Sequence, residues 1–190
     1  MIVAVAALRT ELLFVRGCPR VRTGIGPGAR ERLARALERI RPRAAVILGF
    51  CGATRARLAP GTLILATSLR RGEEELAIPE EIVAAAREGL PGAQAGTMVT
   101  VDGMADAAEK ARLSLDAVAV DMESFHLAVA LRERGIPFLV VRCVLDPLWE
   151  DLSQRSNVLL APRALRCARR LARAMRTLAP LLAEVISREA

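Results

Sequence analysis

The sequence has few aromatic residues: it has no tyrosine, one tryptophan and four phenylalanines among 190 residues. Proteins that bind single-stranded nucleic acids stack the bases on aromatic side chains, so this scarcity disfavours that class. The net charge of +7 comes almost entirely from arginine, since Lys110 is the single lysine. Many arginines are interleaved with glutamate, as in residues 30–32 and 132–134. We interpret them as solvent-facing residues of helices and expect no nucleic-acid partner.

Long apolar runs are also missing, since none approaches the ~20 residues that a membrane helix needs. The apolar stretch from Met1 to Leu8 is followed by Arg9 and Glu11 and has no basic leader. It therefore predicts a buried strand and not a signal peptide, and we expect no membrane partner. The four cysteines show no C-x-x-C spacing. Reduced, structural thiols in a cytoplasmic protein are the expectation.

The composition is that of a globular chain, with 53% hydrophobic and 26% charged residues. A length of 190 residues without internal repeats or a linker predicts one domain spanning residues 1–190. Apolar strands alternate with helices, which indicates an α/β fold. One predicted helix is the alanine-rich segment from Pro79 to Gly89. Another runs from Pro162 to Met175, with apolar residues on one side and arginines on the other.

The stretch from Val118 to Asp146 contains the most informative pattern. A short apolar run is followed by a helix, for which Gly135 is the expected left-handed stop, and then by a second apolar strand. This predicts a strand–helix–strand unit with a right-handed crossover. Asp121, Glu123 and Asp146 fall just past the carboxyl ends of the two strands. Ligands bind at such strand ends in open α/β sheets.

The same stretch carries a family resemblance. V-A-V-D-M-E-S, followed by G-I-P-F-L-V-V-R-C-V-L-D, resembles the A-V-(E/D)-M-E … (V/I)-P-F-x-x-(V/L)-R-x-(I/V)-(S/L)-D signature of the nucleoside phosphorylase/nucleosidase superfamily. That superfamily includes purine and uridine phosphorylases and methylthioadenosine/adenosylhomocysteine nucleosidase. The D-M-E-S form is most similar to the hopanoid-associated phosphorylase branch. The resemblance implies a single-domain, three-layer fold with a mixed central sheet flanked by helices, here shortened relative to the family.

A glycine-rich turn follows the first strand. Gly24, Gly26 and Ala29 fit the G-x-G-x-x-A dinucleotide pattern, but the strand from Ala44 to Phe50 does not end in the acidic residue that ribose recognition requires. The turn also resembles the (S/T)-G-I-G-x-x-x-A strand-to-helix junction of the superfamily. We adopt this structural interpretation.

The resemblance also implies roles for four residues, three in the two motifs and one just after the first predicted strand. Glu123 would bind the ribose hydroxyls and stabilise positive charge on the sugar, and Met122 would pack against the sugar. Asp146 would protonate the purine N7, which requires a raised pKa. Glu11 would orient and deprotonate the attacking water. Without the resemblance, Glu11 fits a surface glutamate in the first turn of a short helix.

Further positions match the parts of the family that surround the nucleoside. Cys51 and Gly52 fall in a small-residue loop whose backbone approaches the ligand, although Phe50 is larger than the family residue there. Met104 falls where the nucleosidases place an aromatic that stacks on the base. A core methionine is an equally good interpretation of Met104. Arg142, within an apolar strand, is expected to pair with a carboxylate.

The predicted activity is cleavage of the N-glycosidic bond of a purine, adenosine-type nucleoside, which releases the free base by hydrolysis or phosphorolysis. The alternative is a non-catalytic nucleoside-binding or scaffold protein that retains the fold. The resemblance implies no metal and no cofactor, with phosphate as a candidate co-substrate. The G-D-P-x-R phosphate loop of the hexameric phosphorylases is missing from the sequence. A small-molecule nucleoside is the expected partner, and a homo-oligomer, specifically a dimer, the expected assembly.

Overall fold

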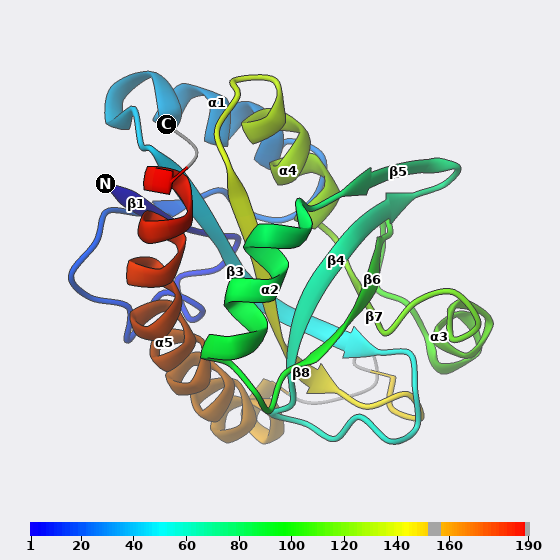
Figure 1. Cartoon of the computed structure of the whole chain (residues 1–190). Helices are drawn as coiled ribbons and strands as arrows, with labels where there is room; N and C mark the ends of the chain where they lie inside the picture. The colour runs from blue at the N-terminus through cyan, green and yellow to red at the C-terminus, as the bar shows by residue number, and fades with distance from the viewer. Residues whose placement is uncertain (152–156, 189–190) are drawn as a thin grey trace.

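The structure is a computed structural model that describes residues 1–151 and 157–188. Strands and helices alternate along most of this part of the chain (Figure 1). The elements are β1 (Ile2–Ala6), β2 (Arg20–Arg22), α1 (Ala29–Ile40), β3 (Ala44–Ala53), β4 (Leu63–Arg71), β5 (Glu74–Ala77), α2 (Glu80–Gly89), β6 (Gln94–Thr100), α3 (Ala107–Leu113), β7 (Ala119–Asp121), α4 (Ser124–Arg132), β8 (Phe138–Asp146) and α5 (Asn157–Arg188).

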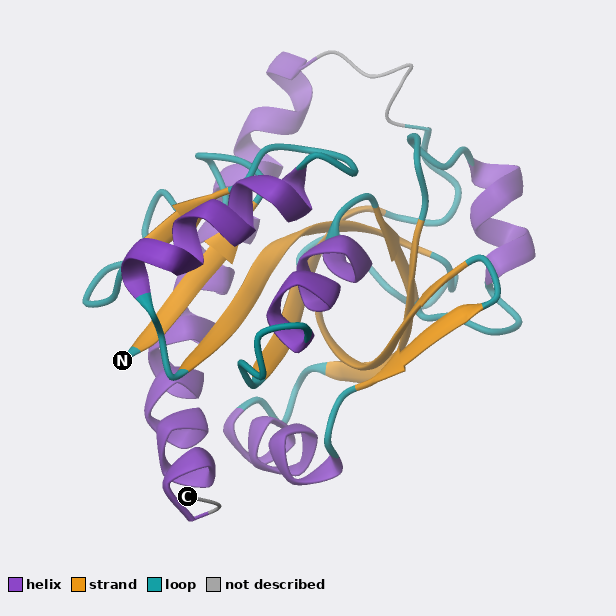
Figure 2. Cartoon of the chain, turned by 90° about the horizontal axis from the view of Figure 1, so that it is seen from above, coloured by secondary structure: helices purple, strands orange, loops and turns teal. Residues whose placement is uncertain are grey.

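The strands form one mixed sheet with the long strand β3 at its centre. β3 pairs in parallel with β1 and β8, and antiparallel with β7. β7 pairs with β6, β6 with β4, and β4 with β8, so these strands and β3 close a ring. Figure 2 shows the ring strands curving around a common centre. The predicted fold class, a mixed central sheet flanked by helices, is confirmed.

The helices cover the sheet in two pairs. α2 packs beside α5, which also contacts β3 and β8, while α1 packs beside α4 (Figure 1). The apolar stripe of α5 continues through Leu178 and Leu182, both buried against the sheet side. For this reason α5 extends well beyond the predicted end at Met175. The predicted helix from Pro79 to Gly89 corresponds to α2.

The predicted strand, helix and strand correspond to β7, α4 and β8, but the predicted right-handed crossover between parallel strands is wrong. β7 and β8 flank β3 on opposite sides and run antiparallel to each other, because β7 pairs antiparallel and β8 parallel with β3. The crossover rule applies to parallel strands of one sheet, so it does not govern this connection. The ends of the two strands nevertheless meet, since Gly52 of β3 pairs with Val120 on one side and Asp146 on the other. Gly135 adopts the expected left-handed conformation, with φ of 63°.

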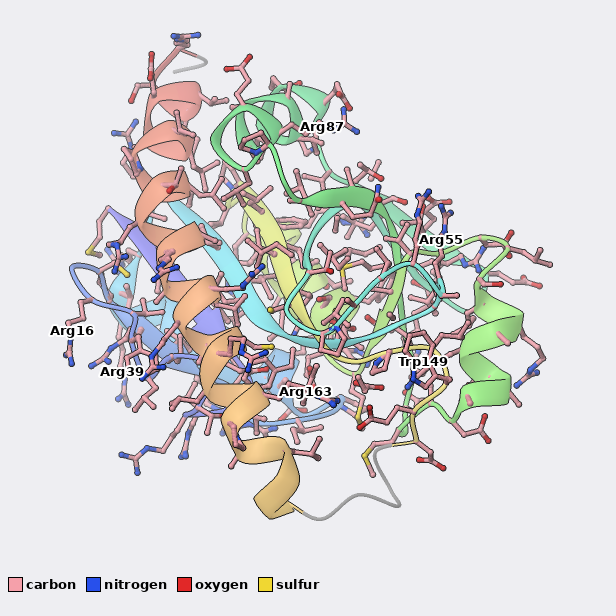
Figure 3. The ribbon with its side chains drawn as sticks, turned by 90° about the horizontal axis from the view of Figure 1, so that it is seen from below. Arg16, Arg39, Arg55, Arg87, Trp149 and Arg163 are labelled. Atoms are coloured by element: carbon pink, nitrogen blue, oxygen red, sulfur yellow. The ribbon has the colours of Figure 1, made fainter. Side chains whose placement is uncertain are left out.

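The arginines lie on several sides of the molecule. Figure 3 shows Arg16 and Arg39 on one side, Arg55 on the opposite side and Arg87 on α2. Arg163 instead turns toward the segment after β8, where it contacts both carboxylate oxygens of Glu150 at 3.0 Å. Within residues 1–151 and 157–188, no helix has the combined length and apolar character needed to cross a bilayer. All four cysteines lie in this part and are free thiols.

Candidate active site

One cleft brings together every residue that the sequence nominated for the site. It has a volume of about 170 Å³ and opens where β3, β7 and β8 end, beside the loops that follow β1 and β6. Its lining includes the seven predicted residues, namely Glu11, Cys51, Gly52, Met104, Met122, Glu123 and Asp146. Their proximity follows from strand pairing around Gly52. Their roles stay predictions.

Glu11 is buried in the turn that follows β1, so its interpretation as a surface residue of a short helix is wrong. One carboxylate oxygen accepts a hydrogen bond from the backbone N–H of Leu8 at 2.7 Å, and the other accepts one from the N–H of Phe50 at 2.8 Å. These two bonds fix the plane of the carboxylate. Burial raises the pKa of Glu11, an effect that the guanidinium of Arg142 opposes.

Arg142 of β8 is fully buried and forms the expected carboxylate pairs. Its Nη2 lies 2.7 Å from Asp121, and its Nη1 lies 3.6 Å from Glu123. Nε and Nη2 also donate to the Ser124 hydroxyl, at 3.0 and 2.8 Å. A Cβ at position 49 would overlap the guanidinium, so only glycine leaves room for it there. Arg142 therefore links β8 to β7 and to the start of α4.

The carboxylate of Asp121 is bound by several groups of the protein itself. It accepts hydrogen bonds from the Thr100 hydroxyl at 2.8 Å and from the backbone N–H of Ser124 at 3.2 Å, besides the Ser124 hydroxyl. The backbone bond satisfies a free amide at the start of α4. Together with the Arg142 pair, these contacts hold the β7–α4 junction beneath the cleft.

Glu123 lies immediately before α4 and faces the cleft. Burial is the main cause that raises the pKa of its carboxyl to about 7; Arg142 opposes this shift, and the nearby Asp121 and Glu11 carboxyl groups add to it. The buried guanidinium of Arg142 is thus the nearby positive charge for three carboxyl groups, those of Glu11, Asp121 and Glu123. Because three negative charges cannot be neutralised by one cation, we expect this cluster to retain part of a proton near neutral pH, mainly on Glu123.

Asp146 has a partner that the sequence did not indicate. Lys110 of α3 has an exposed fraction of 1%, and its Nζ forms a buried ion pair with Asp146 Oδ2. The same Nζ donates to the backbone carbonyls of Glu150 at 2.7 Å and Pro147 at 3.3 Å. Burial raises the pKa of Asp146, and the Lys110 ammonium opposes that effect.

The mouth of the cleft is apolar. Leu8, Ile25 and Met104 line it while remaining 37%, 50% and 62% exposed. The interpretation of Met104 as a core residue is therefore wrong. Phe50, whose size departs from the family pattern, is partly buried and contributes to the wall. Apolar and thioether groups at the rim suit a flat heterocycle better than a charged ligand.

Comparison of the sequence with models of protein families identifies one family. The family model described as "Phosphorylase superfamily" matches residues 20–178. The chain belongs to the phosphorylase superfamily. The predicted superfamily is thereby confirmed, while the hopanoid-associated branch stays a prediction. No curated protein matches the chain in sequence.

Solved structures share the fold of this phosphorylase-superfamily chain at low sequence identity. One is the S-adenosylhomocysteine nucleosidase from Streptococcus pyogenes in complex with 5-methylthiotubericidin, with 20% identity, a TM-score of 0.80, and 94% and 95% of the two chains covered. The 5'-methylthioadenosine/S-adenosylhomocysteine nucleosidase from S. pneumoniae has 18% identity, a TM-score of 0.82 and coverage of 95% and 99%. A futalosine hydrolase mutant of Helicobacter pylori has 17% identity, a TM-score of 0.77 and coverage of 92% and 98%.

Both sequence motifs, at residues 118–124 and 135–146, lie inside the range that matches the phosphorylase superfamily. Glu11 lies outside it. The folded chain, and not the motif match, is what brings the Glu11 carboxylate to the cleft, through its bond to the Phe50 amide of β3.

Proposed function

We propose that this chain is an enzyme that cleaves the N-glycosidic bond of a purine, adenosine-type nucleoside and releases the free base. The observation that carries the proposal is the set of three buried carboxyl groups of raised pKa, Glu11, Glu123 and Asp146, around one cleft of a phosphorylase-superfamily chain. The nucleosidases and the hydrolase with the same fold support it.

The first chemical step separates the base from the sugar. As the C1'–N9 bond breaks, its electron pair leaves with the purine and positive charge develops on the ribose. An ionised Glu123 can accept hydrogen bonds from the ribose hydroxyls and stabilise that charge across the cleft. Asp146 can give its proton to N7, so that the purine departs as a neutral base.

The second step adds water to the sugar. Glu11 is oriented by two backbone amides, and each of its oxygens has a further lone pair with which to bind a water molecule. As the water oxygen attacks C1', its proton passes to Glu11. One proton is given by Asp146 and one is taken by Glu11, and proton exchange with solvent then restores both groups. The overall reaction consumes one water and yields base and ribose.

We favour water over phosphate as the nucleophile. In the proposed mechanism both Glu11 and Glu123, which line the cleft, contact the sugar, and like charges repel a phosphate dianion more than a neutral water. We also expect a dimer that works in the cytoplasm.

Product analysis tests the proposed function. Adenosine, inosine and 5'-methylthioadenosine are incubated with the protein, with and without phosphate, and free base and sugar are separated by chromatography. We expect free purine and unphosphorylated sugar at the same rate in both buffers. A rate that depends on phosphate would reverse the preference for water, and no base from any nucleoside would contradict the proposal.

Nucleoside affinity is expected to fall as Glu123 becomes protonated. With a pKa of about 7, Glu123 is largely ionised above neutral pH and largely neutral below it. If the ionised form binds the ribose hydroxyls, KM should rise about tenfold between about pH 8 and pH 6. Steady-state kinetics on 5'-methylthioadenosine measures this change. Binding of free adenine, which has no ribose, is the control and should not follow the same titration.

Glu123→Gln should stabilise the fold above neutral pH while reducing activity. The pKa of Glu123 is raised in the folded state from 4.5 to about 7, so the stability that it contributes is present below about pH 4.5 and lost as the pH rises through 7. The neutral amide removes this dependence. At about pH 8 we expect a gain of about 3 kcal/mol in the free energy of unfolding, measured with urea. A variant less stable than the wild type at that pH would contradict the assigned charge.

A further inference from the structure

Lys110 is a buried cation that the mechanism above does not use. An unpaired ammonium in the interior is strongly unfavourable, but each of the three Nζ protons has an acceptor here. The acceptors are the Asp146 carboxylate and the carbonyls of Pro147 and Glu150. Lys110 also lines the cleft, and it is the single lysine of the sequence.

The backbone of β3 leaves space for this ion pair. A Cβ at position 52 would lie 3.0 Å from Asp146 Oδ2 and 3.0 Å from Lys110 Cε, which is closer than ordinary van der Waals contact. The register between β3 and β8 also shifts between Cys51 and Gly52, as in a β-bulge. Bulges of this kind redirect side chains beside active sites. Gly52 and the register shift together let Lys110 reach Asp146.

Lys110 connects α3 to the end of β8 and to the turn that follows it. In Figure 1, α3 stands at the edge of the molecule, away from α5. From α3, Lys110 reaches the end of β8 and the turn at residues 147–150, and Arg163 of α5 binds the Glu150 carboxylate of the same turn. The groups that face Asp146 are therefore Lys110 from α3, Glu150 from the turn and the neutral thiol of Cys51 from β3.

We propose that Lys110 is a positioning residue for the reaction proposed above: its ammonium group holds the Asp146 carboxyl and the 147–150 turn against the base side of the cleft. The proposal rests on the proposed function. In the proton-donating state the proton lies on Asp146 Oδ1, while Oδ2 accepts the hydrogen bond from Lys110. When that proton passes to N7, the new carboxylate is already paired with the ammonium group. Burial alone would make Asp146 retain the proton, and the adjacent cation favours its release.

Kinetics of two Lys110 variants test the positioning role. Lys110→Met removes the cation and keeps the length of the side chain, whereas Lys110→Arg retains a cation as the matched control. For 5'-methylthioadenosine, K110M should lose about 10- to 100-fold in kcat. A p-nitrophenyl riboside, whose leaving group departs without protonation, should be cleaved at nearly the wild-type rate.

The pH profile gives a second signature that a purely structural defect would not produce. Loss of the cation raises the pKa of Asp146, so the alkaline limb of kcat should move to higher pH in K110M and stay near its wild-type position in K110R. Equal losses on both substrates, or an unmoved limb in K110M, would overturn the positioning role.

A spectroscopic measurement tests the ion pair without any turnover. Since the chain has one lysine, labelling with ¹⁵N-lysine gives one side-chain ammonium signal. Its protons are buried and bound to three acceptors, so we expect slow exchange with water and a signal that shifts or disappears in Asp146→Asn. A rapidly exchanging signal that is the same in both proteins would overturn the proposal, even if nucleosides are cleaved. Conversely, if no nucleoside is cleaved, the proposed function fails, and this signal still decides whether the ion pair exists.

Discussion

Replacement of Arg142 by methionine is expected to reduce the free energy of unfolding by about 3–5 kcal/mol, a large part of the total for one domain. The guanidinium is fully buried and lies 2.7 Å from Asp121 and 3.6 Å from Glu123. Its removal leaves these carboxyl groups and Glu11 without the cation that lies among them. Urea unfolding at about pH 8 measures the loss, which should shrink toward about pH 5 as the carboxyl groups take up protons.

A surface arginine provides the matched control for this variant. Arg30 pairs with Glu133, and both side chains are about half exposed, at 48% and 47%. Exposed pairs contribute about 0–1 kcal/mol, so Arg30→Met should change the stability little. Similar losses for R142M and R30M, or a loss in R142M that does not depend on pH, would contradict the assigned role of the buried cluster.

Asp146→Asn is expected to reduce kcat on adenosine-type substrates by roughly 10²- to 10⁴-fold, the usual contribution of a general acid. The amide keeps the size of the side chain but has no acidic proton to give to the purine N7. A p-nitrophenyl riboside needs no such proton, so its cleavage should be much less sensitive. Steady-state rates on the two substrates separate a chemical role from a structural one.

Asp116→Asn controls for a change of charge alone, because Asp116 is 60% exposed and pairs with Arg70 on the surface. It should retain wild-type rates on both substrates. Equal losses in D146N for the two leaving groups would remove Asp146 from the proton transfer. A lower melting temperature as the single defect of D146N would do the same.

The sequence predicted those parts of the site that depend on the order of apolar, charged and glycine residues within a short segment. Apolar strands followed directly by acidic residues predicted that Glu123 and Asp146 would meet at one edge of the sheet, and they line one cleft. The pairing of Arg142 was predictable because a cation within an apolar strand must find buried anions. The left-handed stop at Gly135 followed from its position after a helix.

The parts that the sequence missed depend on contacts between distant segments. Closure of the ring requires β4 to pair with β8 and β7 to lie between β3 and β6, and no local periodicity encodes such pairings. Lys110 lies in the segment A-E-K-A-R, which is typical of a solvated helix. The one feature of the sequence that distinguished Lys110 is that it is the single lysine. Its role depends on the space left by Gly52 and on the turn after β8.

The central claim is that the cleft breaks a purine glycosidic bond and does not merely bind a nucleoside. A single-turnover measurement with the protein in excess over labelled 5'-methylthioadenosine tests it most directly, because even slow cleavage then becomes visible. The account predicts complete conversion to free adenine by the wild type and none by Glu123→Ala, although that variant still binds free adenine. Binding of the intact nucleoside without release of adenine, or equal release by both proteins, would contradict the claim; the first of these results would identify a non-catalytic nucleoside-binding protein.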